Sequence, residues 1–135
     1  MIRIGLLAHG SFAEGMLSAL TLIAGEGRQI FVLGLRPDER PEEYRERLIA
    51  VLPTSPDESV LLCTDLFGGT PCNVGTAVAL GRPNVYLVAG VSLAGLLEAV
   101  MAPESLALAE LAERVRCATA ESVRTVVVGG TLSVA

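Results

Sequence analysis

The chain has 135 residues, of which 51% are hydrophobic and only 19% are charged. We expect a single domain over residues 1–135 whose core needs no metal or disulfide bond. The net charge of -5 argues against nucleic-acid binding and against attachment to anionic membranes, because both require a basic face. The chain contains arginine but no lysine, which excludes a lysine Schiff base, a Gly-Lys-Ser/Thr phosphate loop and lysine-assisted aspartyl phosphorylation.

No secretory signal is apparent, because the apolar run after Arg3 ends at His9. No transmembrane helix is apparent either, because the longest uncharged stretches, around residues 66–82 and 83–97, contain several glycines and a turn. We therefore expect no direct insertion into a membrane. The three cysteines lack paired spacing, which indicates reduced thiols and a cytoplasmic protein. A Gly-x-Gly-x-x-Gly fingerprint is missing as well, so we expect no nucleotide cofactor.

The first part of the chain has the pattern of a strand, a helix and a second strand. Residues 1–8 are almost continuously apolar, which is typical of a central parallel strand. Apolar residues then recur at helical spacing from Phe12 to a stop at Gly25, and a second strand follows at residues 29–33. This order predicts the opening of a βαβ unit.

Residues 36–47 are the most charged part of the chain. Their second half reads as a helix that begins at Pro41 and turns Tyr44, Leu48 and Val51 toward the core. We interpret the charges as a solvated helix face, and the alternative is a docking surface for a protein partner.

A third strand over residues 59–63 ends in a turn that contains Asp65 and the pair Gly68-Gly69. Two glycines allow backbone angles or a close approach that a Cβ would block. Thr70 is the expected N-cap of the next helix, whose positive N-terminal end attracts phosphate. If nothing reactive faced it, the turn would be an ordinary connection between a strand and a helix.

The rest of the chain continues the alternation. A fourth strand over residues 84–89 leads to Ser92, the expected cap of a helix over residues 93–101, and a further helix runs to about Val123. The β-branched run 124–130 reads as a terminal strand that pairs within its own subunit or with a neighbour's sheet. The fold class is therefore α/β: an open, doubly wound, mainly parallel sheet with helices on both faces and an antiparallel C-terminal edge strand.

Two of the strands end in residues that together form a candidate site. In an open α/β sheet, ligands bind beyond the carboxyl ends of the strands, so His9 and Asp65 are expected in one crevice. An imidazole whose Nδ1–H is held by a carboxylate offers the Nε2 lone pair as a nucleophile, which predicts phosphohistidine chemistry without a metal. The positions expected around the phosphoryl group are Gly10, Gly68, Gly69 and Thr70.

Three segments carry a resemblance to a known family. They are Ala-His-Gly-Ser-Phe-Ala-Glu-Gly-Met at residues 8–16, Thr-Asp-Leu-Phe-Gly-Gly-Thr-Pro-Cys-Asn at residues 64–73 and Val-Ala-Gly-Val-Ser-Leu at residues 88–93. Together they resemble the mannose-type enzyme IIA of the bacterial phosphoenolpyruvate-dependent sugar phosphotransferase system. The likeness extends over essentially the whole chain.

The resemblance implies that the carrier protein HPr phosphorylates His9 and that His9 passes the phosphoryl group to enzyme IIB. Enzyme IIB then phosphorylates sugar that enters through a IIC/IID membrane permease. It also implies that Asp65 orients His9, that Thr70 lies beside the phosphoryl group, and that a homodimer exchanges the strand around residues 126–128. Some relatives continue into a fused IIB domain, whereas this chain stops at Ala135, so we expect a separate IIB partner.

Other functions are compatible with parts of the sequence. A regulatory protein that controls a kinase or a transcription factor through His9 would have almost the same sequence, and the phosphotransfer subunit of dihydroxyacetone kinase shares the fold. A hydrolase fits less well, because Ser11 lies outside a Gly-x-Ser-x-Gly elbow and Cys72 has Val78 where a cysteine phosphatase has an arginine. We interpret Cys72 as a packing residue, and the alternative is a partly activated thiol.

Overall fold

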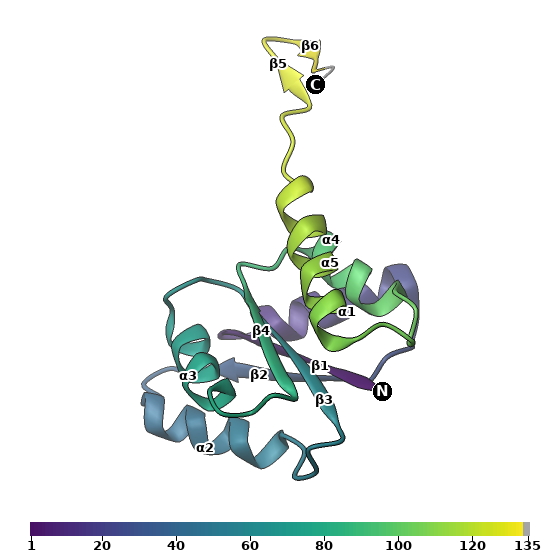
Figure 1. The fold of residues 1–135 in the computed structure, drawn as a ribbon. Helices are drawn as coiled ribbons and strands as arrows, with labels where there is room; N and C mark the ends of the chain where they lie inside the picture. The colour runs from purple at the N-terminus through teal and green to yellow at the C-terminus, as the bar shows by residue number, and fades with distance from the viewer. Residues whose placement is uncertain (134–135) are drawn as a thin grey trace.

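A computed structural model describes residues 1–133, so the last two residues of the domain expected over 1–135 lie outside the described part. Strands and helices alternate along most of the chain (Figure 1). In chain order they are β1 (Ile2–His9), α1 (Phe12–Ala24), β2 (Ile30–Leu35), α2 (Pro41–Val51), β3 (Ser59–Thr64), α3 (Thr70–Ala79), β4 (Val85–Ala89), α4 (Leu93–Met101), α5 (Leu108–Glu121), β5 (Val127–Val128) and β6 (Thr131–Leu132).

Four of the strands form one parallel sheet in the order β2-β1-β3-β4. The strand β1 lies between β2 and β3, and its apolar sequence follows from this position because helices cover both faces of the sheet. The register pairs His9 with Leu35 of β2 and Leu7 with Thr64 of β3. The carboxyl ends of β1, β2 and β3 therefore lie at the same edge, and the predicted α/β fold is confirmed.

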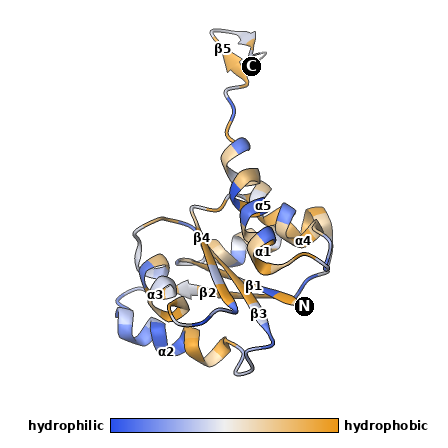
Figure 2. Cartoon of the chain, viewed as in Figure 1, coloured by the Kyte–Doolittle hydropathy of each residue, from blue (hydrophilic) through white to orange (hydrophobic). Residues whose placement is uncertain are grey.

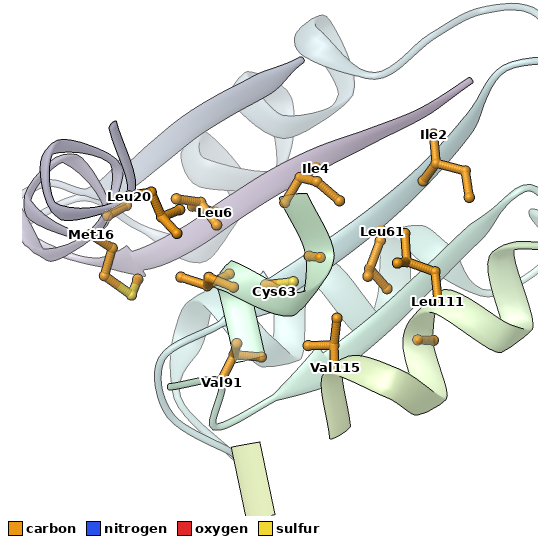
Figure 3. Close-up of a cluster of buried hydrophobic side chains, with 14 of the residues drawn as sticks. Ile2, Ile4, Leu6, Met16, Leu20, Leu61, Cys63, Val91, Leu111 and Val115 are labelled. Atoms are coloured by element: carbon orange, nitrogen blue, oxygen red, sulfur yellow. The ribbon is translucent and has the colours of Figure 1, made fainter. Parts of the chain in front are cut away.

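The two faces of the sheet are covered by different helices. Figure 3 shows the first core, in which α1, α4 and α5 pack on one face. Its strand residues include Ile4, Leu6, Leu61 and Cys63, and its helix residues include Met16, Leu20, Leu96, Leu111 and Val115. The helices α2 and α3 cover the other face. Their core includes Leu7, Leu33, Tyr44, Leu48, Val60, Leu62, Val74 and Val78.

The connections that leave β1 and β3 go to opposite faces of the sheet. The helix after β1 is α1, on the first face, and the helix after β3 is α3, on the second. Because β1 and β3 are neighbours, their carboxyl ends flank the point at which the winding of the sheet reverses. In open α/β sheets this is the place where ligands bind.

After α5 the chain forms a small antiparallel hairpin of β5 and β6, which Figure 1 shows standing away from the sheet. Gly129 and Gly130 form its turn, with φ angles of 56° and 85°, which suit a two-residue hairpin. The strand predicted over 124–130 is therefore shorter, and its antiparallel partner is β6 instead of the edge of the main sheet. The sequence Gly-Gly turns the chain back on itself before a longer strand can form.

Candidate functional site

The site is built on the last residue of β1 and the first residue after β3. The backbone N–H of Asp65 donates to the carbonyl of Leu7 at 3.2 Å, so the turn after β3 stays paired with β1. This bond directs the Asp65 carboxylate toward His9. Its Oδ2 accepts a hydrogen bond from the His9 backbone N–H at 3.0 Å and one from His9 Nδ1 at 2.8 Å. The predicted meeting of His9 and Asp65 is thus present in the structure.

The contact with Asp65 sets the chemistry of the His9 ring. A carboxylate only accepts hydrogen bonds, so the bond assigns the proton to Nδ1 and leaves the lone pair of a neutral ring on Nε2. The His9 side chain is 45% exposed, whereas that of Asp65 is only 10% exposed. The ring of the candidate nucleophile therefore faces solvent, while the carboxylate bonded to it is largely shielded.

Nε2 points toward the start of α3. A Cβ added at Gly69 would lie 2.8 Å from His9 Cε1 and 3.3 Å from His9 Nε2, so only glycine leaves this space open. The preceding Gly68 has a φ of 85°, in the left-handed region that glycine adopts at little cost. Both expected roles of the glycine pair, a special backbone angle and a close approach, occur here at successive residues.

The prediction that Thr70 is the N-cap of α3 is wrong. The N-cap is Gly69, whose carbonyl accepts the first helical hydrogen bond from Asn73 at 2.9 Å, and Thr70 is the first helical residue. Gly69 has extended backbone angles that fit an N-cap, so the helix begins one residue early. The N–H groups of Thr70 and Cys72 have no acceptor within the helix, because helical bonding starts at Asn73. They form a positive helix end beside the His9 ring.

Exposed apolar side chains flank the pair. Phe12 follows His9 at the start of α1 and is 56% exposed, while Leu66 and Phe67 follow Asp65 and are 58% and 83% exposed. Large apolar side chains at this exposure, next to a reactive group, are typical of a surface that binds another protein. The site therefore has an accessible apolar rim.

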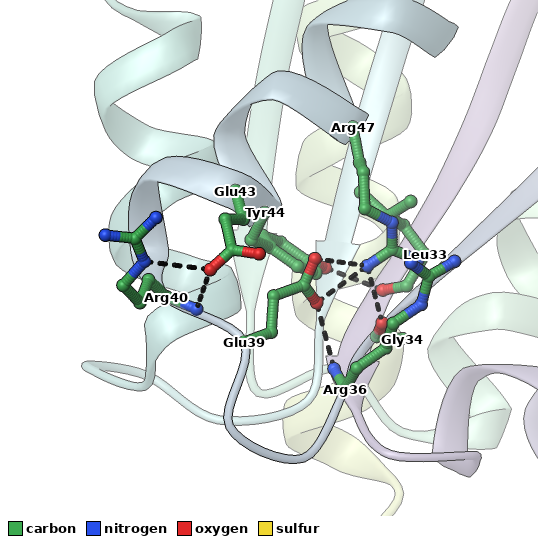
Figure 4. A network of polar contacts seen from close by, with 8 residues as sticks. All are labelled: Leu33, Gly34, Arg36, Glu39, Arg40, Glu43, Tyr44 and Arg47. Carbon is green, nitrogen blue, oxygen red and sulfur yellow. Dashed lines mark hydrogen bonds and ion pairs between the residues drawn. The ribbon is translucent and has the colours of Figure 1, made fainter.

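A polar network next to the site escaped the prediction from sequence (Figure 4). We expected the charges of residues 36–47 on a solvated face, but the Glu39 side chain is only 4% exposed and Arg47 only 25%. Arg47 Nη1 donates to both Glu39 oxygens, at 2.7 and 2.9 Å, and to the Gly34 carbonyl at 3.1 Å. A signal was available: an acidic residue after a Pro-Asp turn, with an arginine on the helix that follows.

These bonds shift the acidity of the groups that make them. Burial acts to raise the pKa of Glu39, but the Arg36 N–H and the Arg47 guanidinium outweigh it, so this pKa lies below its ordinary value. Burial raises the pKa of Tyr44, Arg47 partly offsets the rise, and the charge of Asp65 adds to it. The Tyr44 hydroxyl is therefore neutral, and it donates to the Leu33 carbonyl at 2.6 Å.

The cysteine thiols do not act as nucleophiles in this site. All three are free thiols, and burial raises the pKa of Cys63 to about 12. Cys72 is only 3% exposed, as expected for a packing residue. Within residues 1–133, no group of three or more His, Cys, Asp and Glu side chains is placed to hold a metal ion, and none of the helices there has the length and apolar character to cross a bilayer.

The chain is similar to EIIA components of the phosphotransferase system. Residues 4–116 match the family EIIA-man, described as the PTS system fructose IIA component. The fructose-specific EIIA component of Bacillus subtilis is 28% identical over 123 residues, which are 90% of this chain and 84% of that protein. The mannose-specific EIIAB component of Escherichia coli is 29% identical over 104 residues, which are 75% of this chain and 32% of that longer protein.

A solved structure extends the likeness to three dimensions. The phosphotransferase system component EIIA from Streptococcus agalactiae superimposes with a TM-score of 0.85 at 29% identity, covering 93% of this chain and 97% of its own. The two chains therefore share the same fold over nearly their whole lengths.

Proposed function

This chain belongs to the EIIA-man family of phosphotransferase system components, and we propose that it is a phosphoryl carrier whose phosphorylated residue is His9. The observation that carries the proposal is the 2.8 Å hydrogen bond between His9 Nδ1 and Asp65 Oδ2. It leaves Nε2 unprotonated, exposed and beside a helix N-terminus. We further propose that residues 1–135 act as one cytoplasmic domain.

In the proposed reaction, the Nε2 lone pair attacks the phosphorus of a phosphohistidine on HPr. A nitrogen–phosphorus bond forms at His9 as the one on the donor breaks, and its electron pair returns to the donor nitrogen. The proton on Nδ1 stays in place, so the phosphorylated ring carries a positive charge that the Asp65 carboxylate stabilises. Transfer to a histidine of a separate enzyme IIB is the same exchange in reverse.

The start of α3 is the proposed binding site for the phosphoryl oxygens. The N–H groups of Thr70 and Cys72 and the helix dipole favour negative charge there. The Thr70 hydroxyl makes no hydrogen bond with another described residue, so it is available as a further donor. Gly69 keeps the space beside Nε2 free of a side chain, while Gly10 and Gly68 supply the positive φ angles of the turns that follow His9 and Asp65.

HPr and enzyme IIB are proposed to dock in turn on the apolar rim of Phe12, Leu66 and Phe67. The two partners must present their own histidines to the same Nε2 atom, so their footprints have to overlap. The fused EIIAB relative supports a IIB partner. Contact with the IIC/IID permease would then be indirect, through IIB.

We also propose that the chain is a homodimer. The hairpin strands expose Val127, Val128 and Leu132 at 59%, 60% and 71%, and Figure 2 shows β5 in the colour of hydrophobic residues. Strand β4 is an edge strand of the main sheet, which offers unpaired backbone groups to a second copy. Light scattering of a Val127→Asp variant tests this, since a loss of the dimer is expected and an unchanged mass contradicts it.

The decisive experiment is intact-protein mass spectrometry after incubation with phosphoenolpyruvate, enzyme I and HPr. We expect the mass of one phosphoryl group to be gained by the wild-type chain and not by a His9→Ala variant with an unchanged circular dichroism spectrum. The modification should be acid-labile, as phosphohistidine is. If HPr becomes phosphorylated and the wild-type chain gains nothing, the carrier function is wrong.

A further inference from the structure

The position of His9 depends on the end of β2 as well as on Asp65. The Gly10 N–H, directly after His9, donates to the Leu35 carbonyl at 2.9 Å. On the same strand, a Cβ at Gly34 would lie 2.1 Å from the Gly10 carbonyl oxygen. The residue that follows the nucleophile is thus packed directly on the backbone of Gly34 and Leu35.

The network in Figure 4 holds this part of β2 from the side of α2. Arg47 donates to the Gly34 carbonyl, and Glu39 accepts from the Arg36 N–H at 2.9 Å. The paired side chains of Glu39 and Arg47 therefore form hydrogen bonds with the backbone on both sides of Leu35. The Leu35 carbonyl accepts the hydrogen bond from the Gly10 N–H. The ion pair therefore affects the position of the His9–Gly10 loop through strand β2.

The location of the pair distinguishes it from ordinary surface charges. Arg47 lines a crevice of about 450 Å³ together with Gly10, Ser11 and Gly34, so the guanidinium borders the loop that carries His9. A nearby pair on the same segment, Arg40 with Glu43, has side chains that are 74% and 49% exposed. Exposed pairs of that kind contribute little to stability.

We propose that Glu39 and Arg47 are positioning residues for phosphoryl transfer, which keep the His9–Gly10 loop in register with Asp65 by fixing the end of β2. This inference rests on the function proposed above. Neither side chain is proposed to contact the phosphoryl group. Their effect is on the geometry in which Nε2 meets phosphorus, and a displacement of about 1 Å at such a point lowers rates by up to about 100-fold.

The test compares Arg47→Met with Arg47→Lys, Glu39→Gln and the control Arg40→Gln. Initial rates of transfer from phospho-HPr give kcat and KM for each variant. We expect Arg47→Met and Glu39→Gln to lower kcat about tenfold or more with KM nearly unchanged. Arg47→Lys, which keeps a charge opposite Glu39, should recover part of the loss, and Arg40→Gln should match the wild type.

A second readout does not depend on HPr. His9 is the only histidine of the chain, so its two ring nitrogens give unambiguous ¹⁵N NMR signals. The wild type should show a protonated Nδ1 and an unprotonated Nε2 at a pH at which the ring is neutral. In Arg47→Met and Glu39→Gln, the two tautomers should mix, because the bond to Asp65 is no longer held in place.

The outcomes separate the two proposals. Wild-type tautomer and wild-type kcat in folded Arg47→Met and Glu39→Gln would overturn the positioning role. A mixed tautomer in these variants, in a chain that HPr does not phosphorylate, would support the positioning role and refute the carrier function. If Arg47→Met fails to fold, Glu39→Gln decides, because it keeps the size of the side chain and an acceptor for the Arg36 N–H.

Discussion

The substitution Gly69→Ala tests the geometry of the site at a single atom. The new Cβ would lie 2.8 Å from His9 Cε1, whereas carbon atoms in good contact are about 3.5 to 4.0 Å apart. The ring must therefore move by roughly 0.7 Å or more. That displacement exceeds the spread of distances over which an N–H···O bond stays strong, and the methyl group also lies beside Nε2. We expect phosphoryl transfer to His9 to slow by about 100-fold.

The same change should leave the fold almost untouched. Gly69 has φ of -75° and ψ of 167°, which alanine adopts without strain. Alanine is a poorer N-cap than glycine, but it lowers the entropy of the unfolded chain, and each effect is about 0.5 to 1 kcal/mol. The two effects oppose each other and the weakened His9–Asp65 bond adds about 1 kcal/mol, so the free energy of unfolding should fall by no more than about 2 kcal/mol.

The assay is the initial rate of mass gain from phospho-HPr, with urea denaturation to measure stability. Gly27→Ala is the matched control, because a Cβ there meets nothing within 4 Å and the residue precedes β2, at the opposite edge of the sheet. The control should keep the wild-type rate. If Gly69→Ala also keeps the wild-type rate, the close approach of residue 69 does not determine the position of the His9 ring.

Two further changes probe the carboxylates. Asp65→Asn should slow transfer by about 100-fold or more while HPr still docks, because the amide oxygen still accepts from His9 but no longer balances the charge of the phosphorylated ring. Titration calorimetry with HPr measures docking. An unchanged transfer rate would remove Asp65 from the mechanism. Glu39→Gln should remove an acid-sensitive part of the stability. Because the folded pKa of Glu39 lies below its ordinary value of 4.5, its contribution is present above pH 4.5 and is lost as the pH falls through the folded pKa. Urea unfolding at pH 7 and between pH 5 and 3 should show the gap between wild type and variant closing with acid, and a constant gap would contradict this.

Much of the fold follows from local patterns that the tertiary structure leaves intact. The helix from Leu93 to Met101 has its predicted bounds, and the Ser92 hydroxyl accepts from the Gly95 N–H at 3.3 Å as a cap. Unbroken apolar runs identified the strands, because a strand that is covered on both faces does not alternate between polar and apolar residues. The meeting of His9 and Asp65 was predictable for a related reason: parallel strands bring their carboxyl ends to one edge.

The features that were missed depend on contacts between distant residues. Arg28 is 7% exposed and donates to the Ala102 carbonyl at 3.1 Å, near the end of α4, and no local pattern reveals a partner so far along the chain. The burial of Glu39 and Arg47 likewise depends on where α2 packs on β2. The error at Thr70 has a different origin, since Gly69 and Thr70 both suit an N-cap and the packing against His9 selects the residue without a side chain.

The single oxygen Asp65 Oδ2 receives both the backbone N–H and the ring Nδ1–H of His9. One carboxylate oxygen thereby links the ring to the strand end that carries it, which restricts the rotation of the imidazole relative to β1. The orientation of the nucleophile is settled once, during folding, and its entropic cost is not incurred at each encounter with a partner. Proteins that exchange a phosphoryl group with such a ring have to bring their own histidine to a fixed target. In the proposed complex, adaptation therefore falls to the exposed side chains of the rim and to the partner protein.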